Sequence, residues 1–121
     1  MNHVPGYSIE LDLRQRSVLV VGLGVVGARK AEGLLQAGGR VVGIDPRSRL
    51  SVPAGVEHRV EAFRPAHLNG MSLVFAAATT EVNRQVVRLA KARGIWVNAA
   101  SEPDSGDFFV PAVWRDGPII L

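Results

Sequence analysis

The sequence of this 121-residue chain predicts an α/β fold built on a doubly wound, mostly parallel sheet. One observation is that short runs such as residues 18–21 and 73–78 are wholly apolar, as strands buried on both faces of a parallel sheet are. Another is that segments with helical spacing follow these runs, so that strands and helices alternate. Because no internal repeat or linker interrupts this pattern, we interpret residues 1–121 as a single domain.

Each element follows from its local pattern. The first helix is predicted over residues 25–37, where apolar residues recur at helical spacing until Gly38. The second begins after Thr79 or Thr80, either of which can cap it, and ends at Gly94. Residues 101–107 read as a polar loop. Strands are predicted from apolar or alternating runs at residues 18–21, 40–45, 56–63, 73–78, 95–98, 108–113 and 118–121.

Three glycines lie in the turn between the first predicted strand and the first predicted helix. Gly22, Gly24 and Gly27 have the spacing that permits a sharp turn, a close approach of pyrophosphate and tight helix packing. Asp45 ends the next strand, 18 residues after Gly27, near the position of an acid that binds the ribose of NAD. Together they predict a Rossmann-type site for NAD(P). Alone, the glycines also fit a structural turn, and Asp45 fits a turn residue before Pro46.

The predicted cofactor contacts extend beyond the glycines. Asp45 favours NAD over NADP, because its carboxylate repels a 2′-phosphate. Arg47 and Arg49 could weaken this preference, but we interpret them as part of a solvated loop. Thr79 and Asn98, which follow or end two other strands, are expected near the ribose and the nicotinamide. The predicted cofactor-binding residues are Gly22, Leu23, Gly24, Val25, Val26, Asp45, Thr79 and Asn98, and the predicted cofactor is NAD.

Composition and charge exclude several classes of function. The chain has no cysteine, and His3, His58 and His67 lack metal-ligand spacing, so no metal site is predicted. The net charge is +3 and the basic residues are dispersed, which favours an anionic small molecule over nucleic acid as a partner. No apolar run approaches the roughly 20 residues of a membrane span. The first residues do not resemble a signal peptide, and we expect a cytoplasmic protein without membrane contact.

Polar residues crowd into the loop that follows Asn98. Ser101, Glu102, Asp104 and Asp107 lie there, beyond the carboxyl end of a predicted strand, where ligands bind in doubly wound folds. Clustered carboxylates can act as a general base, bind a metal or raise one another's pKa. The same residues are equally compatible with an ordinary polar loop.

Motifs at both ends of the chain resemble the siroheme synthase family, in its precorrin-2 dehydrogenase and sirohydrochlorin ferrochelatase domain. The similar segments are LDLRQRSVLVVGLGVVGARKAEGLLQAG, EVNRQV, the VN pair at residues 97–98, and DFFVPAVWRDGPIIL. The resemblance implies NAD-dependent oxidation of precorrin-2, a tetrapyrrole that carries many carboxylates, to sirohydrochlorin. Bifunctional members also insert iron. The last predicted strand leaves an edge that a second subunit could pair with, so we expect a homodimer.

The chain departs from the family pattern at three points. Ser101 stands where the family carries an aspartate implicated in catalysis, so Glu102 or Asp104 is the hypothetical replacement, and all three are the candidate catalytic residues. Residues 76–80 read AAATT where the family has an acidic pair. The sequence ends at Leu121 in an apolar run, and we expect the family's dimerisation and chelatase module to be absent. Two alternatives stay open: an NAD-binding regulatory module, as in potassium channels, and a degenerate family member.

Overall fold

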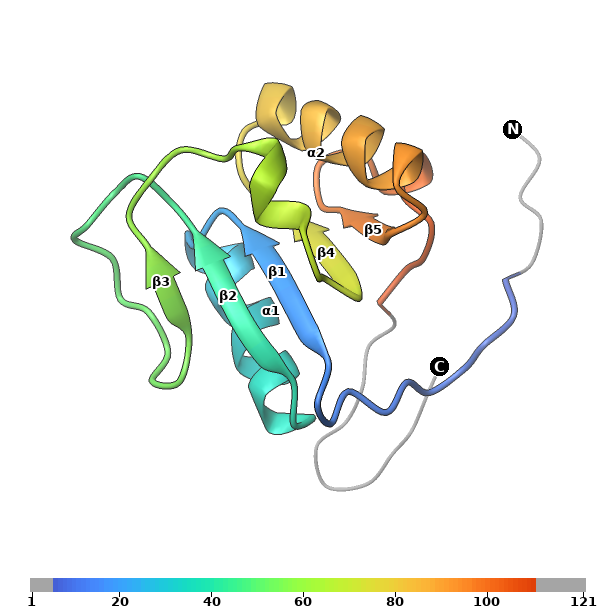
Figure 1. Ribbon diagram of the computed structural model, residues 1–121, viewed down its shortest axis with the longest axis horizontal. Helices are drawn as coiled ribbons and strands as arrows, with labels where there is room; N and C mark the ends of the chain where they lie inside the picture. Colours follow the sequence, from blue (N-terminus) through green and yellow to red (C-terminus); the bar gives the residue numbers. More distant parts are fainter. Residues whose placement is uncertain (1–5, 111–121) are drawn as a thin grey trace.

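The computed structural model describes residues 6–110 as five strands, two α-helices and two short 3-10 helices (Figure 1). The strands form one parallel sheet in the order β3-β2-β1-β4-β5, with β1 at its centre. The elements are β1 (Ser17–Val21), α1 (Val25–Gln36), β2 (Arg40–Ile44), β3 (Glu57–Arg59), η1 (Pro65–Leu68), β4 (Leu73–Ala76), α2 (Thr80–Ala92), β5 (Trp96–Ala99) and η2 (Pro103–Ser105).

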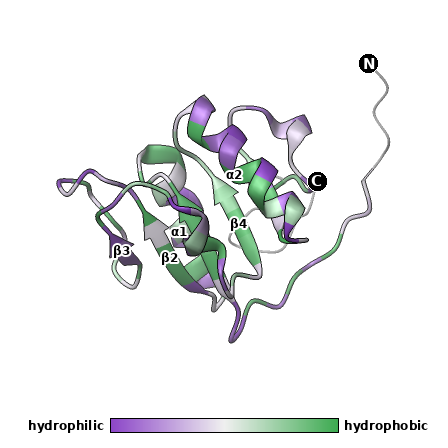
Figure 2. Cartoon of the chain, turned by 45° about the horizontal axis from the view of Figure 1, so that its top comes forward, coloured by the Kyte–Doolittle hydropathy of each residue, from purple (hydrophilic) through white to green (hydrophobic). Residues whose placement is uncertain are grey.

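The central strand β1 is buried on both faces, as its apolar run predicts. Val18 and Val20 pack with Leu34 of α1, whereas Leu19 and Val21 pack with Val86 of α2. The two helices therefore cover opposite faces of the sheet (Figure 1). Figure 2 shows β4 as hydrophobic, while α2 carries hydrophobic and hydrophilic residues on different sides. Each fully buried valine or leucine of this kind contributes about 1.5–3 kcal/mol to folding.

The strand order places the site-forming loops. The chain leaves β1 toward β2 on one side and leaves β4 toward β5 on the other, so the order reverses between β1 and β4. Ligands of doubly wound sheets bind outside the carboxyl ends of the strands at such a reversal. The loops that meet there follow β1, β2 and β4.

Three strand predictions differ from the structure. The predicted strand over residues 56–63 is only β3, because β2 offers it three partners and Glu61 N–H bonds to the Arg59 carbonyl, which turns the chain. The strand predicted over residues 73–78 ends at Ala76, since the Asn83 side chain bonds both backbone groups of Ala78. Residues 108–110 are not a strand. The rest of that prediction, and the strand at residues 118–121, lie outside the described residues.

Candidate nucleotide-binding site

The turn between β1 and α1 is shaped by close backbone contacts that only glycine permits. Gly22 has a φ of 95°, and a Cβ atom on it would lie 2.5 Å from the Ala77 carbonyl oxygen. A Cβ atom on Gly27 would overlap the carbonyl oxygen of Gly22. The first glycine thus brings the turn against the loop after β4, and the third brings α1 against the turn.

The amino termini of the two α-helices differ in how their free N–H groups are satisfied. In α2, Thr79 Oγ1 accepts a hydrogen bond from Val82 N–H, and Glu81 lies in the first turn. In α1 the N-cap is Gly24, with no capping side chain and no acidic residue in the first turn. Unpaired N–H groups and the helix dipole attract anions. The start of α1 therefore fits a pyrophosphate, and the start of α2 is closed by its own side chain.

Asp45, directly after β2, is 3% exposed and accepts four hydrogen bonds. Leu23 N–H donates to Oδ2 at 2.8 Å and Arg47 N–H donates to Oδ1 at 2.9 Å. The Arg47 guanidinium donates through Nε at 3.0 Å and through Nη2 at 2.8 Å. The Arg47 side chain, followed by the N–H groups of Leu23 and Arg47, holds the pKa of Asp45 well below its usual range despite its burial. Asp45 is a fixed anion at the mouth of the glycine turn.

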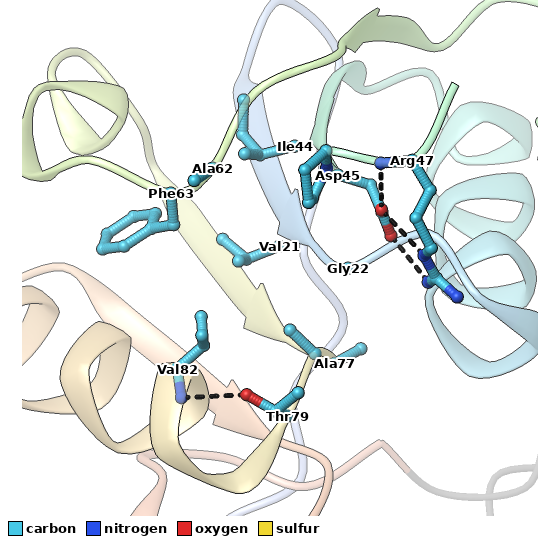
Figure 3. A pocket seen from close by; sticks show the side chains of 12 residues that line it. Val21, Gly22, Ile44, Asp45, Arg47, Ala62, Phe63, Ala77, Thr79 and Val82 are labelled. Atoms are coloured by element: carbon cyan, nitrogen blue, oxygen red, sulfur yellow. Dashed lines mark hydrogen bonds and ion pairs between the residues drawn. The ribbon is translucent and has the colours of Figure 1, made fainter. Parts of the chain in front are cut away.

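A pocket of about 520 Å³ opens at the carboxyl ends of β1, β2 and β4 (Figure 3). Gly22 and Asp45 lie on one side of it, and Phe63, Val82 and Thr79 line the rest. An apolar pocket beside a polar rim suits a flat base attached to a ribose. The full lining is Val21, Gly22, Ile44, Asp45, Pro46, Arg47, Ala62, Phe63, Ala77, Ala78, Thr79 and Val82.

The segment that carries Phe63 is held by His67, which is 5% exposed. His67 Nδ1 accepts the Arg64 N–H at 2.9 Å, and its Nε2 bonds the carboxylate of Glu61. This fixes the tautomer with the proton on Nε2. The hydrogen bond from His67, and then that from Arg64, lower the pKa of Glu61. These bonds on both sides of Phe63 fix one wall of the pocket.

The structure brings together some of the predicted cofactor residues. Gly22, Asp45 and Thr79 line the same pocket. Leu23 acts indirectly, because its N–H binds Asp45 and its side chain is in the core. Val25 and Val26 are exposed at the open start of α1, beside Gly24.

Asn98 lies apart from this pocket, on β5. Its Nδ2 donates to the Phe108 carbonyl at 3.1 Å. Among residues 6–110, its Oδ1 is the only buried side-chain N or O atom that has no hydrogen-bond partner. Asn98 therefore retains a free acceptor for a carboxamide, and its place at the nicotinamide stays a prediction.

The three candidate catalytic residues lie beyond β5, in different surroundings. Ser101 Oγ accepts a hydrogen bond from Asn83 Nδ2 at 3.1 Å, and Asn83 is 2% exposed. Glu102 forms a two-pronged ion pair with Arg84 of α2, at 2.8 and 2.9 Å, which lowers the Glu102 pKa. Asp104 is exposed in η2. The segment that contains them is thus bound to α2, and it does not line the 520 Å³ pocket.

Sequence reasoning missed three residues that shape the site. Arg47 lies in an exposed loop, as predicted, but the periodicity of a sequence does not show that its side chain folds back onto Asp45. Phe63 is the last residue of the predicted strand 56–63, but the strand ends at Arg59 and Phe63 lies in the segment that follows it. Asn83 lies on a helix whose apolar stripe drew attention to other positions, although a buried asparagine near a loop commonly bonds backbone groups.

Within residues 6–110, no three His, Asp or Glu side chains gather as they would around a metal ion. Over the same part of the chain, no helix has the length and hydrophobicity to cross a membrane.

The model of a family described as putative NAD(P)-binding matches residues 9–112. The chain belongs to this NAD(P)-binding family. The membership confirms the predicted fold class and the predicted nucleotide cofactor. It agrees with the glycine turn, the open start of α1 and the anion at Asp45.

The NAD(P)-binding chain is also similar to curated siroheme synthases. It is 36% identical over 95% of its length to the siroheme synthase of Nitrosomonas eutropha, and 37% identical over its full length to that of Nitrosomonas europaea. It spans 26% of the length of each. The resemblance to the siroheme synthase family is therefore confirmed.

Among solved structures, the chain is similar to SirC, a precorrin-2 dehydrogenase. The TM-score is 0.76 with 26% sequence identity, over 96% of this chain and 60% of that one.

Proposed function

We propose that this chain is the nucleotide-binding part of an NAD-dependent dehydrogenase that oxidises precorrin-2 to sirohydrochlorin in siroheme biosynthesis. The observation that carries the proposal is the likeness to SirC over 96% of the chain, in a molecule that keeps the glycine turn and the buried Asp45. The siroheme synthase relatives support the same pathway. Bifunctional members of the family also insert iron, and the proposal does not assign this activity to the chain.

The reaction removes two hydrogens from the tetrapyrrole. One leaves as a hydride with its electron pair and the other leaves as a proton, so NAD supplies the hydride acceptor and a base or water must take the proton. The residues of this chain would bind and orient the cofactor: the open start of α1 would hold the pyrophosphate, and Asp45 would bind the adenosine ribose. Thr79, on the rim of the pocket, would lie near the ribose.

Ser101, Glu102 and Asp104 remain the residues proposed to face the macrocycle. Because Arg84 lowers its pKa, Glu102 is a poor base while the ion pair persists. Ser101 Oγ already accepts from Asn83, which leaves its hydroxyl proton available for donation to a substrate carboxylate. The role of proton acceptor is accordingly assigned to Asp104, the exposed carboxylate of this group.

We further propose that the protein is a cytoplasmic homodimer. Trp96 and Phe109 are 52% and 60% exposed, and with Tyr7 they line a second hollow of about 300 Å³ beside β5. Large exposed apolar side chains that gather in this way favour a protein interface. Light scattering of the purified protein would give the mass of a dimer, and a monomer at high concentration would contradict this part of the proposal.

The direct experiment is an anaerobic assay of precorrin-2 with NAD. Formation of NADH together with sirohydrochlorin, in equal amounts, supports the proposal. Binding of NAD without any NADH formation, with the chain supplied at stoichiometric concentration, contradicts it.

A second candidate function is an NAD-binding module without chemistry. It is favoured by the neutral Ser101 and by the ion pair that engages Glu102. The same assay separates the two candidates, because this module binds NAD and forms no NADH. A Ser101→Asp variant that gains activity would then identify the chain as a degenerate member of the family.

A further inference from the structure

Arg47 occupies the part of the nucleotide site where the adenosine ribose is expected. Its Nε and Nη2 atoms bind the two carboxylate oxygens of Asp45 (Figure 3). Its Nη2 atom also lies 3.6 Å from the point where a Cβ atom of Gly24 would be. The guanidinium therefore spans the gap between the end of β2 and the glycine turn.

The bonding capacity of Asp45 is used up in this arrangement. A carboxylate has about four lone-pair sites, and Asp45 accepts four hydrogen bonds. Two of these come from backbone N–H groups that belong to the fold. A ribose hydroxyl can donate to Asp45 only if the guanidinium of Arg47 moves away. Binding of NAD through Asp45 therefore competes with an internal ion pair.

The guanidinium donors of Arg47 that do not contact Asp45 favour a bound phosphate. A guanidinium has five N–H donors, and Asp45 uses one on Nε and one on Nη2, so three remain. The side chain is 62% exposed, and it lines the pocket. A phosphate matches this planar set of donors. Paired with Arg47, the carboxylate of Asp45 no longer presents an uncompensated negative charge to such a phosphate.

We propose that Arg47 sets the cofactor choice of this site, and that through it the chain accepts the 2′-phosphate of NADP and binds NADP with a dissociation constant within about thirtyfold of that for NAD. The inference rests on the proposed nucleotide-dependent function and extends it to a second cofactor. Arg47 acts in opposite directions on the two nucleotides. It stabilises bound NADP by a charge-assisted contact, and it weakens binding of NAD by competing for Asp45.

The test compares wild type with Arg47→Ala by calorimetric titration with NAD and NADP. Adenosine 5′-monophosphate and adenosine 2′,5′-bisphosphate serve as second probes, because they differ only in the 2′-phosphate. Arg49→Ala is the matched control, since it removes the same charge from the same loop at a position that does not bind Asp45. Arg47→Lys keeps the charge but loses the planar set of guanidinium donors, so its NADP affinity should lie between those of Arg47→Ala and wild type.

The variant is expected to fold. When the side chain of residue 47 is removed, Asp45 keeps the hydrogen bonds from Leu23 N–H and from the N–H of residue 47 itself. Retained binding of adenosine 5′-monophosphate reports directly that the pocket is intact. A melting curve recorded beside each titration gives the same information without a ligand.

The expected result is a change in opposite directions. In Arg47→Ala the affinity for NADP falls by about tenfold to a hundredfold, as loss of a charge-assisted hydrogen bond predicts, while the affinity for NAD stays equal or rises. In wild type the two dissociation constants lie within about thirtyfold of each other. In Arg49→Ala the ratio of the NADP to the NAD dissociation constant changes by less than about threefold.

A wild-type preference for NAD above about thirtyfold would overturn the inference. So would an Arg47→Ala variant in which the dissociation constant for NADP, divided by that for NAD, rises less than about fivefold. A drop in NAD affinity equal to the drop for NADP also overturns it. These results leave the proposed dehydrogenase intact. By contrast, binding of both nucleotides without oxidation of precorrin-2 would contradict the enzyme and leave the inference standing.

Discussion

The carboxyl edge of the sheet has two halves that differ in how their polar residues are used. Around β1 and β2, the glycine turn and Asp45 form a shaped site next to a pocket, and α1 begins with open N–H groups. Beyond β5, Ser101 and Glu102 are bonded to α2 through Asn83 and Arg84. The first half leaves the N–H groups at the start of α1 without a side-chain cap beside a pocket, and the second uses Ser101 and Glu102 within the fold.

This difference indicates that cofactor binding and chemistry make different demands on the chain. A dinucleotide is held by backbone geometry and one buried anion, and both lie within residues 22–45. Proton transfer needs a side chain with a matched pKa in contact with the substrate. The described residues form the glycine turn and the buried anion, whereas beyond β5 Ser101 and Glu102 are bonded within the fold and Asp104 is exposed.

The largest effect is expected from Gly27→Ala. A Cβ atom there overlaps the carbonyl oxygen of Gly22, so either α1 or the turn must move. The cost should exceed about 4 kcal/mol, a large share of the stability of a small domain. Urea unfolding and NAD titration measure the two consequences together.

Gly33→Ala is the matched control for this substitution. Apart from the neighbouring residues and the backbone of the same helix, no atom lies within 4 Å of a Cβ atom on Gly33, which is also in α1. Alanine should raise helix stability there by up to about 1 kcal/mol. A Gly27→Ala chain as stable as Gly33→Ala would contradict the close-packed turn.

Asn83→Ala should have the next largest effect. The substitution removes the side chain that binds both backbone groups of Ala78 and the hydroxyl of Ser101. Buried groups left unsatisfied cost about 1–3 kcal/mol each, so unfolding should become easier by at least about 2 kcal/mol. Asn69→Ala, which removes an exposed contact to Arg93, is the control. Equal losses in the two variants would show that the buried hydrogen bonds of Asn83 contribute no more to stability than an exposed contact does.

Asp45→Asn tests whether NAD binding depends on the half of the site around β1 and β2. Loss of the charge should weaken NAD by about tenfold or more, because hydrogen bonds to an ionised carboxylate are the stronger kind. The substitution also has a pH signature. The pKa of Asp45 is lowered on folding, so its contribution to stability is complete above its unfolded pKa of about 3.9 and is lost as the pH falls toward the folded pKa.

Unfolding of wild type and Asp45→Asn between pH 7 and about pH 2 measures this signature. The difference in stability between the two proteins should be constant near neutrality and shrink below about pH 4. A difference that does not depend on pH would mean that the carboxylate is not held as an anion by Arg47 and Leu23.

The smallest effect is expected from Glu102→Gln. Its ion pair with Arg84 is exposed to solvent, and pairs of this kind contribute little. The melting temperature should hardly change, and the affinity for NAD should stay within about twofold of wild type. A loss of NAD affinity as large as that of Asp45→Asn would contradict the independence of the two halves.

The geometry around β1 and β2 was easier to predict from the sequence than that of the segment beyond β5, for a physical reason. Glycine spacing and an acid at a strand end are local patterns that backbone geometry enforces, so Gly22, Gly27 and Asp45 could be found without a structure. The fold of Arg47 onto Asp45 and the pairing of Glu102 with Arg84 depend on rotamers and on contacts distant in sequence. Edge strand β3 was predicted too long because only its neighbour β2 determines where pairing stops.

The central claim is that the dinucleotide binds at the edge formed by β1, α1 and the end of β2. Amide signals in a two-dimensional nuclear magnetic resonance spectrum of the labelled chain, recorded during titration with NAD, test it most directly. The account predicts the largest shifts at Leu23, Gly24 and Gly27 and at the Arg47 amide, with small shifts from Ser101 to Asp107. Shifts confined to residues 101–107, or no shifts at saturating NAD, would contradict it.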